Sequence, residues 1–257
     1  MASHPPDCCC TKLQCARLNN GYRGTPSGTD LVINESIQGY LARPKDPDRR
    51  HSAIVYLPDI FGIWQNSKLM ADAFASHGYT CLVLDLFNGD SVSLNMPHDF
   101  DIMGWFAHGS DGKNPHTSQE IDPIVIAGIK YLQAQGATQL AAVGYCIGAK
   151  YVIRHYRSGI DCGFIAHPSF VETTELAAIT GPLSIAVAEM DDIFTPEKRH
   201  ESEAILSEIK QPYQINLLSG VGHGFAVRCD LNDTSQRFAK DQAFNQAVAW
   251  FDRYILD

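Results

Sequence analysis

The sequence has no long apolar run, although 45% of its 257 residues are hydrophobic. No stretch approaches the roughly 20 apolar residues that a membrane-spanning helix needs. The chain is also poor in positive charge: 20 Lys and Arg stand against 29 Asp and Glu, with no basic cluster to offset a net charge of −9. That balance disfavours nucleic-acid binding. We therefore expect neither a membrane nor a nucleic acid as a partner.

The N-terminus lacks the basic start and apolar core of a secretory signal. We therefore expect a cytoplasmic protein, whose eight cysteines are free thiols rather than a disulfide framework. Four of them crowd the first residues. Structural zinc sites need pairs of ligands with a second pair further on, and that spacing is absent here. We expect no metal and no cofactor. The clustered cysteines are Cys8, Cys9, Cys10 and Cys15.

Residues 1–30 are rich in Cys, Gly, Pro, Ser and Asn, which is typical of an irregular segment. From residue 31 to 257 short apolar runs alternate with helical patterns, without repeats or low-complexity tracts. This alternation predicts one α/β domain with a mostly parallel central sheet and helices on both faces. The expected strands are Asp30–Asn34, Gln38–Ala42, Ala53–Leu57, Tyr79–Leu84, Gln139–Val143, Cys162–Ala166, Leu183–Ala188 and Tyr213–Leu218. The expected helices are Ser67–His77, Ser118–Gln135, the stretch after Cys146, Pro196–Ile209 and Ser235–Tyr254.

One connection, Asn88–His116, is unusually long. A long connection in a compact domain is usually functional or disordered. Its aromatic residues Trp105 and Phe106 favour a loop or short helix that roofs a pocket. An ordinary surface excursion is the alternative.

The most informative stretch is Val143–Gly148, with the sequence VGYCIG. A strand, a sharp G-x-C-x-G turn and a helix form a nucleophile elbow with cysteine in place of serine. Gly144 and Gly148 remove the side chains that would collide with the turn. A free cysteine also packs well as a small hydrophobe, but the two spaced glycines favour Cys146 as a nucleophile.

A thiol nucleophile needs a base, a group that orients the base, and donors for the oxyanion. In α/β-hydrolases the chain order is nucleophile, acid, histidine. Asp191 follows the strand Leu183–Ala188, with Asp192 as its competitor, and His223 follows the next strand between two glycines. Both partners therefore occur after Cys146 in the expected order, and we favour Asp191 because it lies closer to the strand end.

At this point the chain resembles the dienelactone hydrolases, over nearly its whole length. The similar motifs are GYCIG at residues 144–148, AEMD at 188–191, GHGFA at 222–226 and DIFG at 59–62. HPSF at residues 167–170, EKRHE at 197–201 and the cysteine-bearing N-terminus resemble the eukaryotic, especially fungal, branch. The resemblance implies an α/β-hydrolase fold and a triad of Cys146, His223 and Asp191. It also implies an oxyanion hole formed by the backbone N–H groups of Ile147 and Ile60.

Two departures from the bacterial archetype matter. Its E-I-F-G turn has a glutamate that helps to deprotonate the thiol, whereas this chain has the shorter Asp59, so we expect His223, alone or with Asp59, to activate Cys146. The archetype also carries pocket arginines that bind a substrate carboxylate, and the turn after the fourth expected strand has none here, which leaves Arg228 as a candidate cation. The substrate therefore does not transfer with the resemblance. The residues that we predict to line the pocket are Trp64, Phe87, Trp105, His167 and Arg228.

These observations predict a cofactor-independent hydrolase of a small activated acyl compound, such as a lactone, enol ester or thioester, with a thioester at Cys146 as the intermediate. Two alternatives stay open. The same triad could serve non-hydrolytic work in fungal secondary metabolism, such as lactonisation, ring formation or dimerisation. Alternatively, the protein is a non-catalytic binder of a small ligand on a hydrolase fold. A homodimer is left open.

Overall fold

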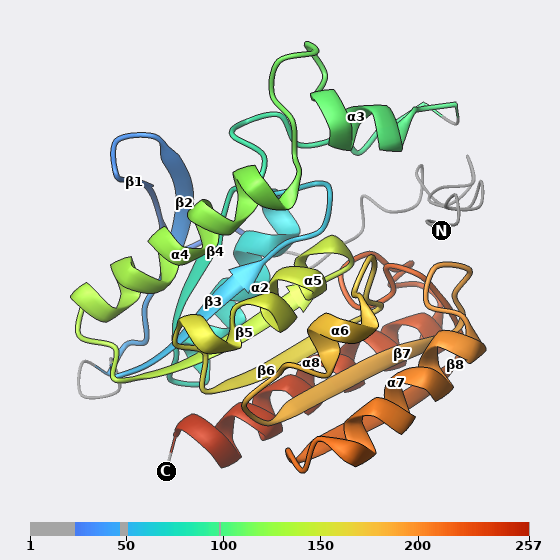
Figure 1. The fold of residues 1–257 in the computed structure, drawn as a ribbon. Helices are drawn as coiled ribbons and strands as arrows, with labels where there is room; N and C mark the ends of the chain where they lie inside the picture. The colour runs from blue at the N-terminus through green and yellow to red at the C-terminus, as the bar shows by residue number, and fades with distance from the viewer. Residues whose placement is uncertain (1–23, 47–50, 98, 257) are drawn as a thin grey trace.

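The computed structural model describes residues 24–46, 51–97 and 99–256. The clustered N-terminal cysteines and most of the expected irregular segment lie outside the described residues. Alternating apolar runs form an eight-stranded sheet in the order β1-β2-β4-β3-β5-β6-β7-β8 (Figure 1). Its strands are β1 Thr29–Ile33, β2 Ile37–Ala42, β3 Ser52–Leu57, β4 Thr80–Leu84, β5 Gln139–Tyr145, β6 Cys162–Ala166, β7 Leu183–Met190 and β8 Tyr213–Gly222.

The sheet is mostly parallel, as the alternation predicts. The hairpin of β1 and β2 pairs antiparallel to β4, and the strands from β4 to β8 run parallel. Parallel strands place their carboxyl ends along one edge, where ligands bind in open α/β sheets. That edge therefore carries the turns after β3, β5, β6, β7 and β8.

Helices cover both faces of the sheet (Figure 1). One face packs under α2 and α8, and the other under α4, α5, α6 and α7. The helices are α2 Gln65–Ser76, α3 Ile102–His108, α4 Ser118–Ala134, α5 Ile147–Arg154, α6 Thr173–Leu176, α7 Pro196–Glu208 and α8 Thr234–Ile255, with a 3-10 turn at Tyr156–Ser158.

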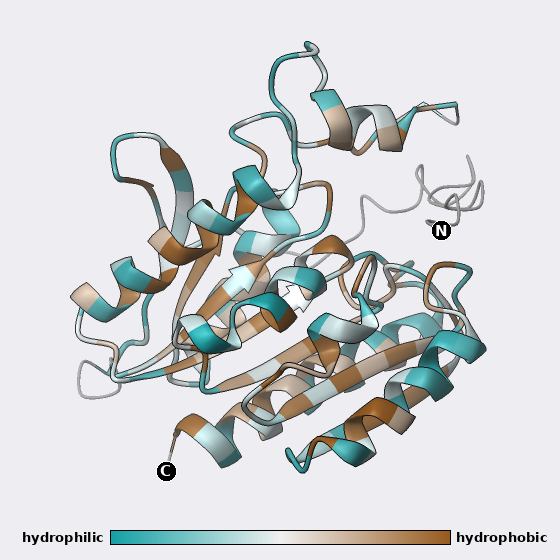
Figure 2. Cartoon of the chain, viewed as in Figure 1, coloured by the Kyte–Doolittle hydropathy of each residue, from teal (hydrophilic) through white to brown (hydrophobic). Residues whose placement is uncertain are grey.

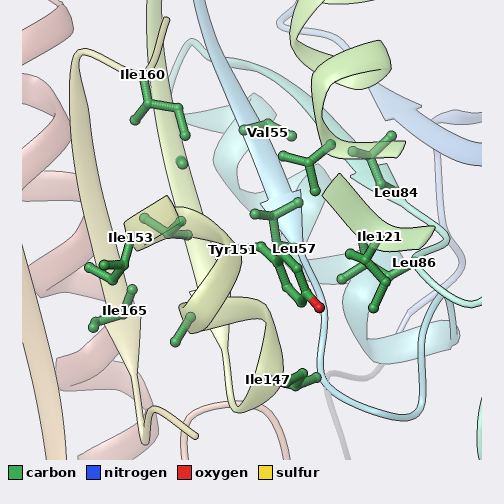
Figure 3. Packing of buried hydrophobic residues seen from close by; sticks show 14 of the residues in the cluster. Val55, Leu57, Leu84, Leu86, Ile121, Ile147, Tyr151, Ile153, Ile160 and Ile165 are labelled. Atoms are coloured by element: carbon green, nitrogen blue, oxygen red, sulfur yellow. The ribbon is translucent and has the colours of Figure 1, made fainter. Parts of the chain in front are cut away.

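The central strands are buried on both faces, which accounts for their continuous apolar sequences. Figure 2 shows this apolar colouring along the sheet between the more polar outer faces of the helices. Figure 3 shows part of the cluster beneath α4 and α5. Leu57 of β3, Leu84 of β4 and Tyr151 of α5 are each at most 2% exposed there. This packing fixes the carboxyl ends of the strands relative to the first turn of α5.

The α/β-hydrolase fold expected from the sequence is confirmed, and the differences are local. The long segment 88–116 contains the short helix α3, and β7 and β8 each extend further than their apolar runs suggested. No helix among the described residues combines the length and hydropathy that crossing a bilayer requires.

The two glycines of the elbow, Gly144 and Gly148, stand where there is no space for a side chain. A Cβ built on Gly148 would lie 2.6 Å from the carbonyl carbon of Leu57 and 2.7 Å from the carbonyl oxygen of Pro58, with the Leu57 oxygen closer still. At Gly144 a Cβ would lie 2.7 Å from the Gly148 oxygen and 2.8 Å from the Ala149 Cα. These neighbours are backbone atoms, which cannot turn aside as a side chain can.

We predict that Gly148→Ala lowers the free energy of unfolding by about 3 kcal/mol or more, because β3 and α5 must separate to admit the methyl group. Urea denaturation measures this loss. Gly112→Ala is the matched control, since Gly112 has a positive φ of 76° but nothing within 4 Å of its built Cβ. It should lose only about 1–2 kcal/mol. Equal losses at the two glycines would contradict the steric argument.

Candidate active site

Cys146 occupies the turn between β5 and α5. Its backbone has φ 54° and ψ −118°, a strained region for a residue with a side chain. Strand pairing holds it there: Tyr145 pairs with Ala166 of β6, and the Cys146 N–H donates to the Ala166 carbonyl at 3.2 Å. The residue is 7% exposed and faces a small cavity at the carboxyl edge of the sheet. The strained turn therefore directs the thiol towards the cavity and not into the core.

Asp191 and His223 meet at the ends of β7 and β8. The pairing of these strands shifts between Ala188 and Met190, so that Met190 lies opposite Gly222 and the next residue of each strand lies at the same point of the edge. His223 Nδ1 lies 2.9 Å from Asp191 Oδ2. The other oxygen, Oδ1, accepts the N–H groups of Ile193 and Phe194, each at 2.9 Å. Asp191 is 4% exposed, whereas its competitor Asp192 points to solvent.

The three groups shift one another's protonation. Burial opposes charge on His223, but the Cys146 thiolate and the Asp191 carboxylate outweigh burial and raise the pKa of His223 to about 9. Burial raises the pKa of Cys146, yet the charge and hydrogen bond of His223 bring it below its ordinary value. Asp191 is buried too, and His223 with the two backbone donors lowers its pKa. Cys146 and His223 thus each favour the charged form of the other, a thiolate beside an imidazolium.

The turn after β3 lies next to the elbow, because Leu57 pairs with Gly144. Asp59 is 2% exposed, and its two oxygens accept the Phe61 N–H at 3.1 Å and the Arg228 guanidinium at 2.7 Å. Burial raises the pKa of Asp59, and Arg228 counteracts that effect. The Arg228 guanidinium also lies 4.5 Å from the centre of the Phe61 ring. Asp59 thus has Arg228 as its charged partner within the site.

A small cavity of about 20 Å³ adjoins the thiol. Ile60 and Ile147, the two residues expected to supply oxyanion N–H groups, both line it, as does Arg228. The rest of the wall is largely apolar. It consists of Ile102, Phe106, Ser169, Phe170 and Ile193.

The other side chains predicted to line the pocket lie elsewhere. Phe87 and Trp105 are buried in the core, with ring centroids 4.9 Å apart and ring planes tilted by 58°, and neither lines the cavity. Trp64 is half-buried at the start of α2 and faces a separate hollow near Gly24. His167 is fully buried with its ring 4.9 Å from that of His223, and burial keeps its pKa well below the ordinary value. The Phe87, Trp105 and His167 rings are thus buried close to the site and do not line the cavity.

Helix α3 roofs the cavity through Ile102 and Phe106. Hydrogen bonds to Asp90 hold the roof in place. The Asp90 carboxylate lies 2.9 Å from His116 Nε2 and accepts the Ser110 N–H at 2.8 Å. The Asp90 carbonyl accepts the Trp105 indole N–H at 3.0 Å. The long segment thus covers the nucleophile, in agreement with its aromatic content.

Comparison with known proteins shows the family of the chain. The model of the dienelactone hydrolase family matches residues 37–255, which is most of the chain. The chain belongs to the dienelactone hydrolase family. "Hydrolase pyvD" of Aspergillus violaceofuscus is 45% identical over 99% of both chains. "Dienlactone hydrolase 1" of Gibberella moniliformis is 34% identical, over 98% of this chain and 95% of its own.

A solved structure supports the fold independently of sequence. The dienelactone hydrolase of Anabaena variabilis superposes with a TM-score of 0.64 at 10% identity, covering 90% of this chain and 98% of its own. At that identity the likeness speaks for the fold alone. Family membership and the fungal relatives make this protein a hydrolase of the dienelactone hydrolase family.

Ser169 lies in the HPSF motif at residues 167–170 but was not among the predicted site residues of this dienelactone hydrolase family member. Its hydroxyl lies 3.3 Å from Cys146 Sγ and 3.5 Å from His223 Nε2. The signal was its position, since it follows β6, the neighbour of the elbow strand β5. A serine after a strand has no pattern of its own, so only the strand order reveals it.

We predict that His223→Ala slows alkylation of Cys146 by iodoacetamide about 100-fold at pH 6, because the thiol loses the cation that stabilises its thiolate. In the unaltered protein, the alkylation rate should stop rising once the pH exceeds the lowered pKa of Cys146. In the variant, the alkylation rate should keep rising towards pH 9 and beyond. Peptide mass spectrometry reports the rate at Cys146 separately from the other cysteines.

Asp191→Asn should fall between these two profiles, since the imidazolium loses its carboxylate partner. Asp192→Asn is the matched control and should leave the profile unchanged, because that side chain points to solvent. A pH profile of His223→Ala equal to that of the unaltered protein would refute the ion pair.

Proposed function

We propose that this hydrolase cleaves small, activated, uncharged acyl compounds, namely lactones, enol esters or thioesters, through a Cys-His-Asp triad and a thioester intermediate. One observation carries the proposal. A thiol with a lowered pKa faces a small, largely apolar cavity, with an imidazole beside it whose far nitrogen lies 2.9 Å from a buried carboxylate. This combination of nucleophile, base and orienting acid supports acyl transfer.

The first half-reaction would run as follows. The Cys146 thiolate attacks the carbonyl carbon, and the electron pair of the C=O bond moves to the oxygen. That oxyanion accepts the N–H groups of Ile60 and Ile147, which border the cavity on two neighbouring strand ends. As the intermediate collapses, the leaving group takes the Nε2 proton of His223 and departs, and the acyl group remains on sulfur.

In the second half-reaction, His223 takes a proton from water, whose oxygen attacks the thioester carbon. The thiolate is expelled, and the imidazolium and thiolate are restored. A thiolate is a good leaving group as well as a good nucleophile. An acyl compound whose own leaving group is stabilised is therefore a suitable substrate, and a simple amide is a poor one.

The wall of the cavity favours an uncharged acyl group. Isoleucine and phenylalanine side chains form most of the lining, and the one cation on it, Arg228, faces the carboxylate of Asp59 at 2.7 Å. A substrate carboxylate would have to compete with a buried, geometrically fixed carboxylate for that guanidinium. We therefore infer that the acyl part of the substrate is apolar.

We predict that aryl esters, enol lactones or thioesters give an acyl adduct at Cys146, visible by intact mass after rapid acid quench. Cys146→Ala should lose the adduct and at least about a thousandfold of the turnover. Cys81→Ala removes a different buried thiol and should keep both. Turnover that survives Cys146→Ala would exclude the cysteine mechanism.

We predict that Asp59→Asn raises the ratio of kcat/KM for a succinyl aryl ester over a pentanoyl aryl ester about tenfold, since Arg228 then lacks its carboxylate partner. The two acyl groups have similar length and differ in charge. Adding Arg228→Met to that variant should cancel the gain. An unchanged ratio in Asp59→Asn would contradict the assignment of Asp59 as the group that neutralises Arg228.

A further inference from the structure

The Ser169 hydroxyl lies in the reaction centre. Its oxygen is 3.3 Å from Cys146 Sγ and 3.5 Å from His223 Nε2, so it faces the nucleophile and the base at once. The residue is 1% exposed, and it also lines the cavity beside the thiol. A hydroxyl in that position contacts both the sulfur of Cys146 and the Nε2 atom of His223.

The backbone holds the hydroxyl in place. The Ser169 N–H donates to the Cys146 carbonyl at 3.0 Å, which joins the turn after β6 to the elbow itself. On the next residue, the Phe170 carbonyl accepts the Lys150 ammonium at 3.0 Å. Lys150 is anchored in turn by the Glu175 carboxylate at 2.8 and 2.9 Å. The turn is thus fixed from two sides, and its left-handed residues, with φ 39° at His167 and 58° at Phe170, indicate that the chain bends sharply to present Ser169.

The chemistry of the two neighbours determines what the hydroxyl does. A thiolate only accepts hydrogen bonds, and the Nε2–H of an imidazolium only donates them. A hydroxyl has one proton to donate and lone pairs to accept, so Ser169 fits between them as donor to sulfur and acceptor from Nε2. A donor to an anionic sulfur is a charge-assisted hydrogen bond, which is stronger than a neutral one.

We propose that Ser169 is a further catalytic residue, which donates its O–H to the Cys146 thiolate before acylation and holds the attacking water beside His223 afterwards. This inference rests on the proposed role of Cys146 as the nucleophile. Once the acyl group is on sulfur, the sulfur no longer carries the charge that attracts the Ser169 proton. The hydroxyl then accepts one O–H of the water, while Nε2 takes the other proton as the water oxygen attacks the acyl carbon. Ser169 itself neither gains nor loses a proton.

The test compares Ser169→Thr with Ser169→Val, which have nearly the same shape and differ in the hydroxyl. The first readout is the pH dependence of Cys146 alkylation by iodoacetamide. The charged and titratable groups that face the thiol are His223 and Asp59, with Asp191, His167 and Arg228 behind them, and all are unchanged between the variants. We expect Ser169→Val to react about tenfold more slowly than Ser169→Thr below the midpoint of the profile, as for the loss of one hydrogen bond to a charged group.

The second readout is the burst of an activated aryl ester, which separates acylation from thioester hydrolysis. Ser169→Val should reduce the steady-state rate more than the burst rate, and Ser169→Thr should retain both. Equal alkylation profiles for the Thr and Val variants would overturn the proposal. Ser169→Ala, compared with the unaltered protein, gives the same answer if the larger side chains prevent folding.

Alkylation requires no turnover, so it tests Ser169 separately from the proposed function. If no ester or lactone acylates Cys146 but the Thr and Val variants differ in alkylation, the hydrolytic proposal fails and the hydrogen bond from Ser169 to the thiolate stands. If esters are hydrolysed but the two variants behave alike, Ser169 is a packing residue.

Discussion

At Gly148 the first turn of α5 lies directly against the carbonyl groups of Leu57 and Pro58, without room for a side chain between them. That contact fixes two things at once. It keeps Cys146 in its strained conformation, and it holds the turn of Asp59 and Ile60 beside the elbow. The positions of Cys146, of the Ile60 and Ile147 backbone and of the Asp59–Arg228 pair therefore depend on the same contact, the packing of the first turn of α5 on the end of β3.

The charges of the site are arranged in matched pairs. The Cys146 thiol faces His223, and each favours the charged form of the other; the second nitrogen of His223 faces Asp191, and Asp59 faces Arg228. Burial strengthens each attraction, because the local dielectric is low, and it also makes an unmatched charge costly. The two partners of each pair follow different strands. The order and pairing of the strands therefore also keep the opposite charges next to each other.

The parts of the site with a strong local pattern were predictable from the sequence. The elbow glycines, the carboxylate after β7 and the glycine-flanked histidine each mark a turn at a strand end. The sequence favoured Asp191 over Asp192 through its place nearer the strand end, and in the structure the Ile193 and Phe194 N–H groups hold the Asp191 carboxylate beside His223. Aromatic pocket residues were harder, since Phe87 and Trp105 serve the core equally well. Ser169 depends on β6 lying next to β5, a long-range fact without a local signature.

The cavity beside Cys146, at about 20 Å³, has room for about one water molecule. Phe106 of the roof borders this space, with its ring centroid 5.6 Å from that of Phe170. Asp90 holds the roof at Trp105, Ser110 and His116, whereas Lys150 holds the Phe170 carbonyl. For the reaction proposed above, an acyl group larger than one water molecule would require the roof and the Phe170 turn to separate, once for arrival and once for departure. Movements of such covers take microseconds to milliseconds, so their frequency would set a ceiling on turnover that no gain in thiol reactivity could exceed.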